Sequence, residues 1–254
     1  MISRFREQLE ENKAVTMVWC GMRDPQLVST IARQDFQAVL LDSQHGYHNE
    51  ASFLESIPLI VLAGKTPLVR IPVNRWDLCE RVLDFGALGV VAPMINTLEE
   101  AKVFAAAVKY PKIGSRSYGP HHAAMLYGLT SKEYVIEAND ATIALAQIET
   151  LEAYKNLDAI LSVDGIDGVL MGPSDFSISV TGQQVPDPYG SDTVKIIADI
   201  AERTNALGKV AAAFTVTAEH ANLVHSMGYR LISIGSDSQI VTSGAEKCFE
   251  NLAF

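Results

Sequence analysis

The chain has 254 residues, of which 48% are hydrophobic and 20% are charged, a balance typical of a soluble globular protein with a substantial core. Its formal net charge of −10 argues against a nucleic-acid partner, because nucleic-acid-binding domains carry a basic patch. The three cysteines, Cys20, Cys79 and Cys248, are widely spaced and include no CxxC pair. They predict neither a disulfide framework nor a zinc site, and they fit a reducing compartment.

The N-terminal segment 1–7 is charged and lacks the apolar core of about 7–15 residues that a signal peptide needs. No part of the chain approaches the roughly 18 uninterrupted apolar residues of a membrane span. We therefore expect a cytoplasmic protein that has no membrane partner.

Short apolar or β-branched segments alternate with longer amphipathic segments along the whole chain. The short segments predict strands at 15–19, 38–41, 68–71, 89–93, 142–148, 168–171, 210–214 and 231–234. The longer ones predict helices at 27–33, 51–61, 78–85, 98–108, 151–162, 193–207, 219–226 and 239–252. Strands that are apolar throughout, each followed by a helix, indicate a parallel sheet covered on its outer face.

Eight such units, at about 32 residues each, predict a closed (β/α)₈ TIM barrel that forms a single domain over residues 1–254. The segment 113–139 interrupts the repeat as a loop-helix insertion before the fifth strand. The last helix, within 238–254, carries Ile240, Val241, Phe249 and Leu252. These side chains could pack on a neighbouring subunit, so this helix is a candidate for exchange between subunits.

Two carboxylates follow consecutive predicted strands, at the barrel rim where active sites of this fold lie. Glu149 comes directly after the fifth strand, and Asp175 follows the sixth within the sequence GPSD. Two hard oxygen ligands with open positions left over suit Mg²⁺ or Mn²⁺, which can then chelate a small keto acid. The alternative is that each carboxylate caps the helix that follows it.

His45 and Arg70 fall at the same rim, after the second strand and near the end of the third. An imidazole is suited to act as a general base, and Asp42, three residues earlier, could fix its tautomer. Arg70 is suited to hold a substrate carboxylate or keto oxygen. Two plainer alternatives remain open: His45 is an ordinary loop histidine, or Arg70 forms an internal salt bridge to Asp42 or Glu149.

No lysine is predicted at the carboxyl end of a strand. Lys65 and Lys209 precede their strands and so fall on the opposite face of the barrel. A Schiff-base aldolase needs a lysine in its site, so this chemistry is disfavoured.

With these residues in place, the sequence resembles the metal-dependent (class II) pyruvate aldolases of the 4-hydroxy-2-oxoheptanedioate and 2-dehydro-3-deoxyglucarate aldolase family, the HpcH/HpaI aldolases. The resemblance extends over residues 4–252. It is densest in the segments LLDSQHG at 40–46, PLVR at 67–70, GVVAPM at 89–94, QIET at 147–150 and DGVLMGPSD at 167–175. Their order and spacing together are specific, although each segment alone is weak.

The resemblance implies a TIM barrel in which Glu149 and Asp175 are the protein ligands of Mg²⁺, Mn²⁺ or Co²⁺. It also implies that Gln147 and Arg70 hold the pyruvyl unit, helped by backbone amides around Ser174.

For proton transfer, the resemblance implies that His45 is the base, acting through a metal-bound water and paired with Asp84. Asp42 would support the same network. Members of the family can supply such residues across a subunit contact. We therefore expect a homo-oligomer, a trimer or a hexamer built from trimers.

Two departures from the family pattern concern the other half of the site. Gln44 stands where the family commonly has Glu, which removes a negative charge near the metal waters. The Gly-x-Arg-Gly loop of the family is replaced by 114–120, where Tyr118, with His121 just after it, is expected to reshape the aldehyde side. Phe214 ends a strand where it could form a wall of the pocket.

The resulting hypothesis is reversible aldol cleavage of a 4-hydroxy-2-oxo acid to pyruvate, or a pyruvate analogue, and an aldehyde through a metal-stabilised enolate. The small-molecule partners would be a 2-oxo acid and an aldehyde. Within the same class, decarboxylation of an oxaloacetate-type acid and use of hydroxypyruvate remain open. In a different class, the chain would be a non-catalytic barrel that binds 2-oxo acids.

Overall fold

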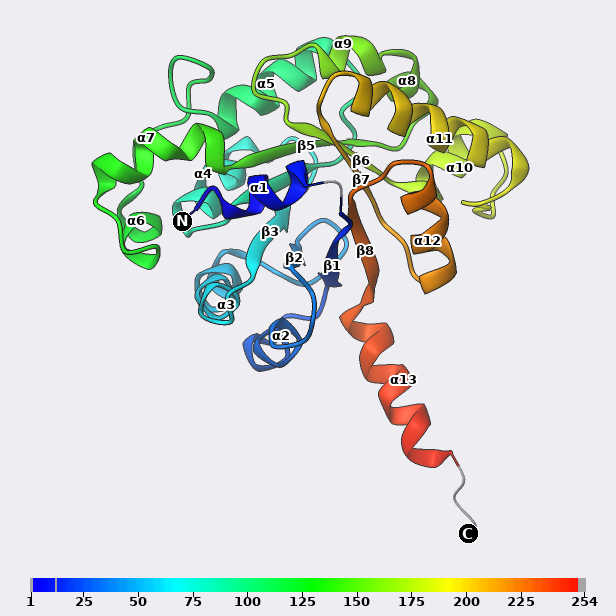
Figure 1. Ribbon diagram of the computed structural model, residues 1–254, viewed down its shortest axis with the longest axis horizontal. Coiled ribbons are helices and arrows are strands. Elements are labelled where there is room, and N and C mark those ends of the chain that lie inside the picture. Colours follow the sequence, from blue (N-terminus) through cyan, green and yellow to red (C-terminus); the bar gives the residue numbers. More distant parts are fainter. Residues whose placement is uncertain (1, 12, 251–254) are drawn as a thin grey trace.

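The computed structural model describes residues 2–11 and 13–250. Eight parallel strands follow one another around a closed barrel, and the last strand pairs with the first (Figure 1). The prediction of a single-domain (β/α)₈ barrel is confirmed. The strands are β1 (Val15–Cys20), β2 (Ala38–Asp42), β3 (Thr66–Arg70), β4 (Gly89–Ala92), β5 (Ile143–Ile148), β6 (Gly168–Met171), β7 (Val210–Ala213) and β8 (Leu231–Ser236).

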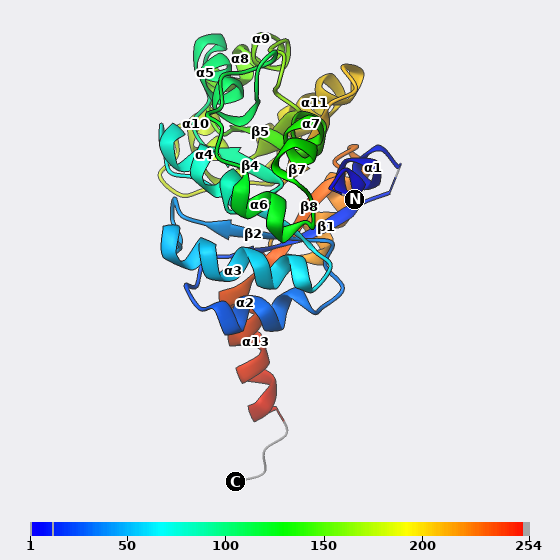
Figure 2. The same ribbon diagram turned by 90° about the vertical axis from the view of Figure 1, so that its left-hand side faces the viewer.

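Helices surround the barrel (Figure 2), and six of the eight predicted helices have both ends within two residues of their predicted bounds. The segment predicted as one helix at 151–162 is divided at Asn156, which ends one helix and precedes the next. The helices are α1 (Arg4–Glu10), α2 (Pro25–Ala32), α3 (Glu50–Leu62), α4 (Trp76–Asp84), α5 (Leu98–Val108), α6 (His121–Leu126), α7 (Ser131–Ala141), α8 (Leu151–Lys155), α9 (Leu157–Leu161), α10 (Pro173–Thr181), α11 (Ser191–Ala206), α12 (Ala218–Ser226) and α13 (Asp237–Phe249).

The interior of the barrel is filled by side chains that alternate along each strand. On β1, Val15, Met17 and Trp19 belong to the interior cluster, whereas Val18 and Cys20 pack outward against helices. This alternation is the period of a β-strand, so every second residue of an apolar strand faces inward. The last inward residue of each strand therefore faces the site at the rim.

Helix α1, which was not predicted, closes the amino end of the barrel. Its buried Phe5 and Leu9 belong to the same interior cluster as the strand residues. An ion pair between Arg6 and Asp167, with 2.6 Å from Nη2 to Oδ1, fixes the helix to the start of β6. Because α1 covers the amino end, a cavity open to small molecules is expected at the carboxyl end of the barrel.

The final helix behaves differently from the others, because it projects away from the barrel in both ribbon views (Figures 1 and 2). Ile240, Val241 and Phe249 are 40%, 45% and 72% exposed on it. Leu252, which was predicted to share this role, lies outside the described residues.

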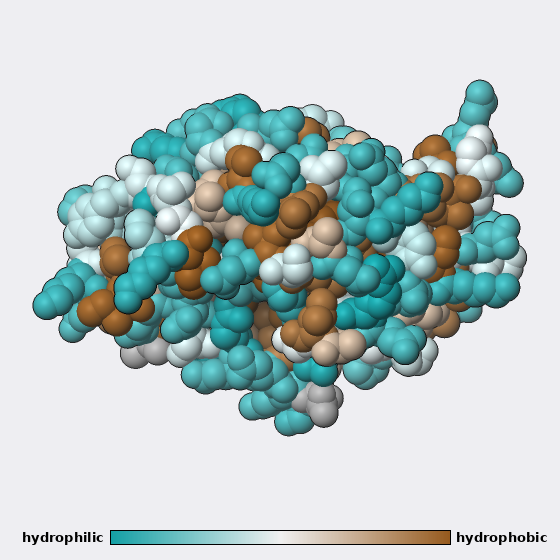
Figure 3. Space-filling view, turned by 90° about the horizontal axis from the view of Figure 1, so that it is seen from above, coloured by the Kyte–Doolittle hydropathy of each residue, from teal (hydrophilic) through white to brown (hydrophobic). Residues whose placement is uncertain are grey.

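Between α5 and β5 the chain forms α6 and α7, so two helices occupy most of the segment 113–139. Hydrophilic residues cover much of the face in Figure 3, with smaller apolar patches between them. Within the described part of the chain, no helix is both long enough and apolar enough to span a membrane.

Candidate active site

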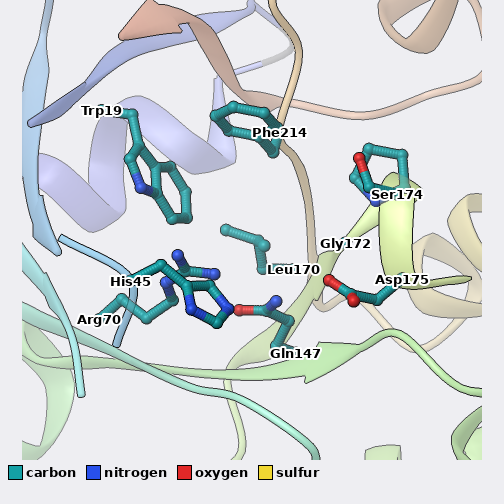
Figure 4. A pocket seen from close by; sticks show the side chains of 10 residues that line it. Trp19, His45, Arg70, Gln147, Leu170, Gly172, Ser174, Asp175 and Phe214 are labelled. Atoms are coloured by element: carbon teal, nitrogen blue, oxygen red, sulfur yellow. The ribbon is translucent and has the colours of Figure 1, made fainter. Parts of the chain in front are cut away.

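A cavity of about 230 Å³ lies at the carboxyl ends of the strands. Polar side chains from several strand ends converge on it, and aromatic rings form another wall (Figure 4). The lining residues are Trp19, His45, Arg70, Gln147, Leu170, Gly172, Pro173, Ser174, Asp175 and Phe214. The structure thus brings together five of the predicted site residues at the cavity wall, besides Phe214: His45, Arg70, Gln147, Ser174 and Asp175.

Arg70 and Asp42 form a buried ion pair at the ends of two adjacent strands, where they are register partners. Arg70 Nε and Nη2 donate to the two carboxylate oxygens at 2.9 and 2.6 Å. Burial alone would raise the pKa of Asp42, but the hydrogen bonds and charge of Arg70 outweigh it and hold this pKa below its usual value. The internal salt bridge that the sequence left open is therefore present, and it leaves Nη1 as the guanidinium nitrogen available to a ligand.

Trp19 completes this unit. Its indole N–H donates to Asp42 Oδ2 at 3.3 Å, and the guanidinium carbon of Arg70 lies 4.7 Å from the centre of its ring. The contacts fix the plane of the guanidinium, because the Trp19 ring lies against one of its faces and two of its nitrogens are bonded to Asp42. A planar substrate carboxylate would therefore meet a preoriented arginine.

Glu149 is held beside the cavity, with its side chain buried by other atoms of the barrel rim. The Met94 amide donates to Oε1 at 2.8 Å, and the Gln147 side-chain amide donates to Oε2. Met94 has a left-handed φ of 57°, a conformation that non-glycine residues rarely adopt. Burial raises the pKa of Glu149, and the nearby charge of Asp175 raises it further.

Gly172 lets β5 and the start of α10 approach closely. A Cβ at this position would lie 3.0 Å from Gln147 Nε2 and 3.1 Å from Glu149 Oε2. Pro173 then begins α10, whose first turn places Ser174 and Asp175 at the mouth of the cavity (Figure 4).

Neither predicted metal ligand caps a helix, although that alternative was open. Thr150, and not Glu149, is the N-cap of α8, and its side chain accepts from the Ala153 amide. The N-cap of α10 is Gly172, and no side chain caps that helix. The two carboxylates are therefore available for another role.

The donor set fits a hard divalent cation. Gln147 donates its side-chain amide to Glu149, and its Oε1 is buried without a hydrogen-bond partner in the described structure. Within residues 2–11 and 13–250, no three His, Cys, Asp or Glu side chains gather in a metal-binding arrangement. A cation here would rest on Glu149 and Asp175, which leaves positions open for a chelating ligand.

His45 lies in the exposed loop 43–47 after β2 and lines the cavity. Asp42 was expected to fix its tautomer, but this expectation is not met: the side chain of Asp42 bonds to Arg70, Trp19 and the Gln44 amide. The Asp42 carboxylate pairs with Arg70 because a buried guanidinium needs a counter-charge. The Oε1 atom of Gln44, the departure from the family pattern, is buried without a partner.

Asp84 lies far from His45 in the same chain, because it ends α4 at the amino end of the barrel. Its carboxylate accepts from Arg116 Nη2 at 2.8 Å, and the loop 114–120 packs against it so closely that a Cβ on Gly119 would come within 2.6 Å of Oδ2. Tyr118 and His121 belong to the same region and do not line the cavity. A pair between His45 and Asp84 therefore requires two chains.

The apolar wall includes residues that the sequence did not single out. The Trp19 and Phe214 rings meet edge to face, with centroids 5.0 Å apart, and Leu170 lies at the same cavity. Strand alternation could have identified Trp19 and Leu170, since each is an inward residue near a strand end. No sequence signal indicates the left-handed conformation of Met94.

Comparison with known proteins supplies the family. The HpcH/HpaI aldolase/citrate lyase model matches residues 15–243. A hydroxypyruvate/pyruvate aldolase of Rhizorhabdus wittichii is 32% identical over 246 residues, which cover 97% of each chain.

Two solved structures share the fold. A HpcH/HpaI aldolase/citrate lyase family protein from Burkholderia cenocepacia J2315 superposes with a TM-score of 0.87 at 19% identity, covering 98% of both chains. CitE from Mycobacterium tuberculosis, in complex with magnesium and pyruvate, superposes with a TM-score of 0.57 at 15% identity, covering 97% of this chain and 95% of that one. Because the family model spans nearly the whole barrel, the chain belongs to the HpcH/HpaI aldolase/citrate lyase family.

Proposed function

We propose that the protein is a class II pyruvate aldolase, a carbon–carbon lyase that reversibly cleaves a 4-hydroxy-2-oxo acid to pyruvate and an aldehyde. The observation that carries the proposal is the convergence of Arg70, Gln147 and Asp175 at one cavity, with Glu149 hydrogen-bonded to Gln147 beside it and no lysine among the lining residues of the described chain. Such a site can bind an anionic keto acid, and it offers no amine for a Schiff base.

The substrate would enter with its carboxylate and 2-keto oxygen toward Arg70 and the carboxylate pair. Arg70 Nη1 and backbone amides at Ser174 would orient these oxygens. A divalent ion, such as Mg²⁺, Mn²⁺ or Co²⁺, would be held by Glu149 and Asp175 and would offset the negative charge that develops on the enolate oxygen.

His45 would accept the proton of the C4 hydroxyl, directly or through water, as the C3–C4 bond breaks. The electron pair of that bond would move toward the 2-keto carbon to give the enolate, and an aldehyde would leave. The protonated imidazole, directly or through water, would then deliver this proton to C3, which gives pyruvate. In the addition direction, the same imidazole would return its proton to the new hydroxyl group.

The aldehyde would lie on the side of Trp19 and Phe214. These rings present an apolar surface, and Leu170 extends it at the base of the cavity. We expect the acceptor end of the cavity to favour aldehydes with an apolar portion, because burial of such a surface gains about 25 cal/mol per Å².

A second donor, hydroxypyruvate, is favoured by one observation: the Rhizorhabdus relative, at 32% identity over almost the full length, is a hydroxypyruvate/pyruvate aldolase. The extra hydroxyl group would be attached to C3, the carbon that forms the new bond. The polar groups available to it are His45 and Gln147 Oε1, which lacks a protein partner.

We further propose a homo-oligomer, a trimer or a hexamer, in which a second subunit supplies the carboxylate that pairs with His45. The pair of His45 with Asp84 of a second copy would raise the basicity of the imidazole. The same contact would bring Tyr118 and His121 toward the aldehyde. Helix α13, with Ile240, Val241 and Phe249 exposed, would pack on a neighbouring subunit and is a candidate for exchange.

The test is an aldehyde-panel assay in which pyruvate and hydroxypyruvate are the donors, with Mg²⁺, Mn²⁺ or Co²⁺ added. New carbon–carbon bonds that form only with metal support the aldolase. Pyruvate release from oxaloacetate without any aldol product would favour a decarboxylase. Binding of pyruvate without turnover of any donor would favour a non-catalytic 2-oxo-acid barrel.

A further inference from the structure

The loop that carries His45 is fixed at both of its ends. At the start, Ser43 donates to the Arg70 carbonyl from its amide at 3.0 Å and from its hydroxyl at 2.9 Å. At the end, the amide of Tyr47 donates to the Gly21 carbonyl at 2.8 Å. Gln44, His45 and Gly46 lie between these two hydrogen-bonded ends, so the position of the imidazole depends on where Gly21 is held.

Gly46 and Gly21 make the two rim loops cross in direct contact. A Cβ on Gly46 would lie 2.8 Å from Gly21 Cα and 2.4 Å from the Asp42 carbonyl oxygen. The backbone of the first loop is therefore the surface against which the His45 loop packs. A shift of Gly21 would be transmitted to residue 45 without an intervening flexible side chain.

Asp237 holds this first loop in place. Its Oδ2 accepts from the Met22 amide at 2.7 Å, across a sequence separation of more than two hundred residues. Its other oxygen accepts from the Ser238 amide at 2.7 Å, within the first turn of α13. The side chain is only 2% exposed, although it is a carboxylate.

The charge of Asp237 has no ion-pair partner among the described residues. Burial of an unpaired carboxylate is costly, so its hydrogen bonds must supply much of the compensation. A helix-capping role does not account for the residue, because Ser236 is already the N-cap of α13 and bonds to the Gln239 amide.

We propose that Asp237 is a positioning residue for His45, acting through the Met22 amide, Gly21 and the Tyr47 amide. The inference rests on the role proposed above for His45. Asp237, the first residue of the projecting helix α13, would thus also fix the loop that carries His45. Helix α13 and the active site would then be coupled by one hydrogen bond to the backbone.

The first test measures exchange of backbone amide protons and does not depend on catalytic activity. Hydrogen–deuterium exchange of the full-length protein is compared between wild type and Asp237→Ala. We expect faster exchange in peptides that cover 20–24 and 43–48, and unchanged exchange in α11. Equal exchange of the 43–48 peptide in both proteins would overturn the proposal.

The second test measures pyruvate methyl-proton exchange in D₂O with Mn²⁺. Asp237→Ala should lower kcat by about 10-fold to 100-fold, the effect of a displacement near 1 Å, while KM for pyruvate stays within about twofold. Asp237→Asn should retain most of the wild-type kcat, because its amide oxygen can still accept from Met22. An Asn variant as slow as the Ala variant would contradict the positional role.

A double variant separates positioning from a general structural effect. In a His45→Ala background, Asp237→Ala should cause less than about a twofold further loss, because the residue it positions is gone. Independent, additive losses would contradict the proposal. Asp192→Ala is the matched control, since Asp192 is an exposed acid in the first turn of α11, and it should leave kcat unchanged.

Failure of the proposed function and failure of this inference give different results. If wild type shows no metal-dependent exchange of pyruvate, the aldolase proposal fails, while the deuterium uptake of 43–48 still decides whether Asp237 holds the loop. If Asp237→Ala does not fold, Asp237→Ser replaces it. The serine hydroxyl is one bond nearer to the backbone than Oδ2 and should lose the Met22 contact with the same result.

Discussion

Arg70 and Asp42 form an ion pair that stabilises the rim of the barrel, and in the proposed mechanism the same pair orients a substrate-binding group. Their ion pair is buried, and it orients the guanidinium beside the cavity. Removal of one partner of a buried pair leaves an uncompensated charge, which costs about 3–5 kcal/mol. Substitution of either residue is therefore expected to reduce stability.

We predict that Asp42→Asn lowers the free energy of unfolding by about 3–5 kcal/mol at pH 7. The folded-state pKa of Asp42 lies below its ordinary value of 3.8, so its stabilisation is fully present above about pH 3.8 and is lost as the pH falls through the lower folded value. The gap between wild type and variant should thus narrow below pH 4. Urea unfolding at pH 7, 5, 4 and 3 measures it, and a gap independent of pH would contradict this account.

Gly172 is the second sensitive residue. Its φ of −95° is open to alanine, so Gly172→Ala should cost little in backbone strain, but the new Cβ would press on Gln147 and Glu149. We predict at least about a tenfold loss of Mn²⁺ affinity, comparable to the loss of an outer-shell partner. Isothermal titration calorimetry measures the affinity. An unchanged affinity in a folded variant would argue against Glu149 as a ligand.

The residues at the strand ends were predictable because a parallel barrel collects them on one rim. Arg70, Gln147 and Asp175 were found in this way, and the structure places all three at the cavity. The role of Asp42 was not predictable, because two adjacent side chains, His45 and Arg70, competed for the same carboxylate. Sequence order alone cannot decide such a competition, whereas the register of β2 and β3 does.

At the scale of elements, the regular helices were predictable from their periodicity, and the short ones were not. Helix α10 begins directly after a strand with Gly172 and Pro173, which the sequence suggests as a loop, although proline is favoured in the first turn of a helix. Helix α1 lies before the first strand, outside the repeat that guided the prediction. Both missed helices are positioned by tertiary contacts, which local sequence does not encode.

We predict that Phe5→Ala lowers the free energy of unfolding by about 3–5 kcal/mol, because it opens a cavity beneath the barrel interior. Leu62→Ala is the control, since Leu62 is 80% exposed at the end of α3 and should change stability by less than about 0.5 kcal/mol. Chemical denaturation measures both. Equal stability of the two variants would show that α1 does not belong to the core.

For α13, we predict that the double substitution Val241→Asp and Phe249→Glu reduces the molar mass in solution toward that of a single chain. The helix is almost entirely exposed in one chain, so its apolar side chains gain burial only from a second copy. Light scattering after size-exclusion chromatography measures the mass, and circular dichroism checks the fold. Leu62→Glu is the control, and an unchanged mass in the double variant would contradict the interface.

At the scale of the whole molecule, the eightfold repeat was predictable because eight apolar strands of similar spacing leave few other architectures. The assembly was not, because a single chain exposes α13 and places Asp84 at the opposite end of the barrel from His45. The contact between copies that we propose would account for both observations. A single barrel would then bind the 2-oxo acid, and the assembly would bring Asp84 of a second copy to His45.

In the proposed mechanism, this cavity forms the enolate of a 2-oxo acid with the help of a divalent ion held by Glu149 and Asp175. The most direct measurement is exchange of the pyruvate methyl protons with D₂O, followed by proton NMR in the presence of Mg²⁺, Mn²⁺ or Co²⁺. We predict exchange that is abolished by EDTA and slowed at least about 100-fold in Glu149→Gln, as expected when stabilisation of the enolate charge is lost. Absence of exchange with all three metals, or an equal rate in Glu149→Gln, would contradict the account.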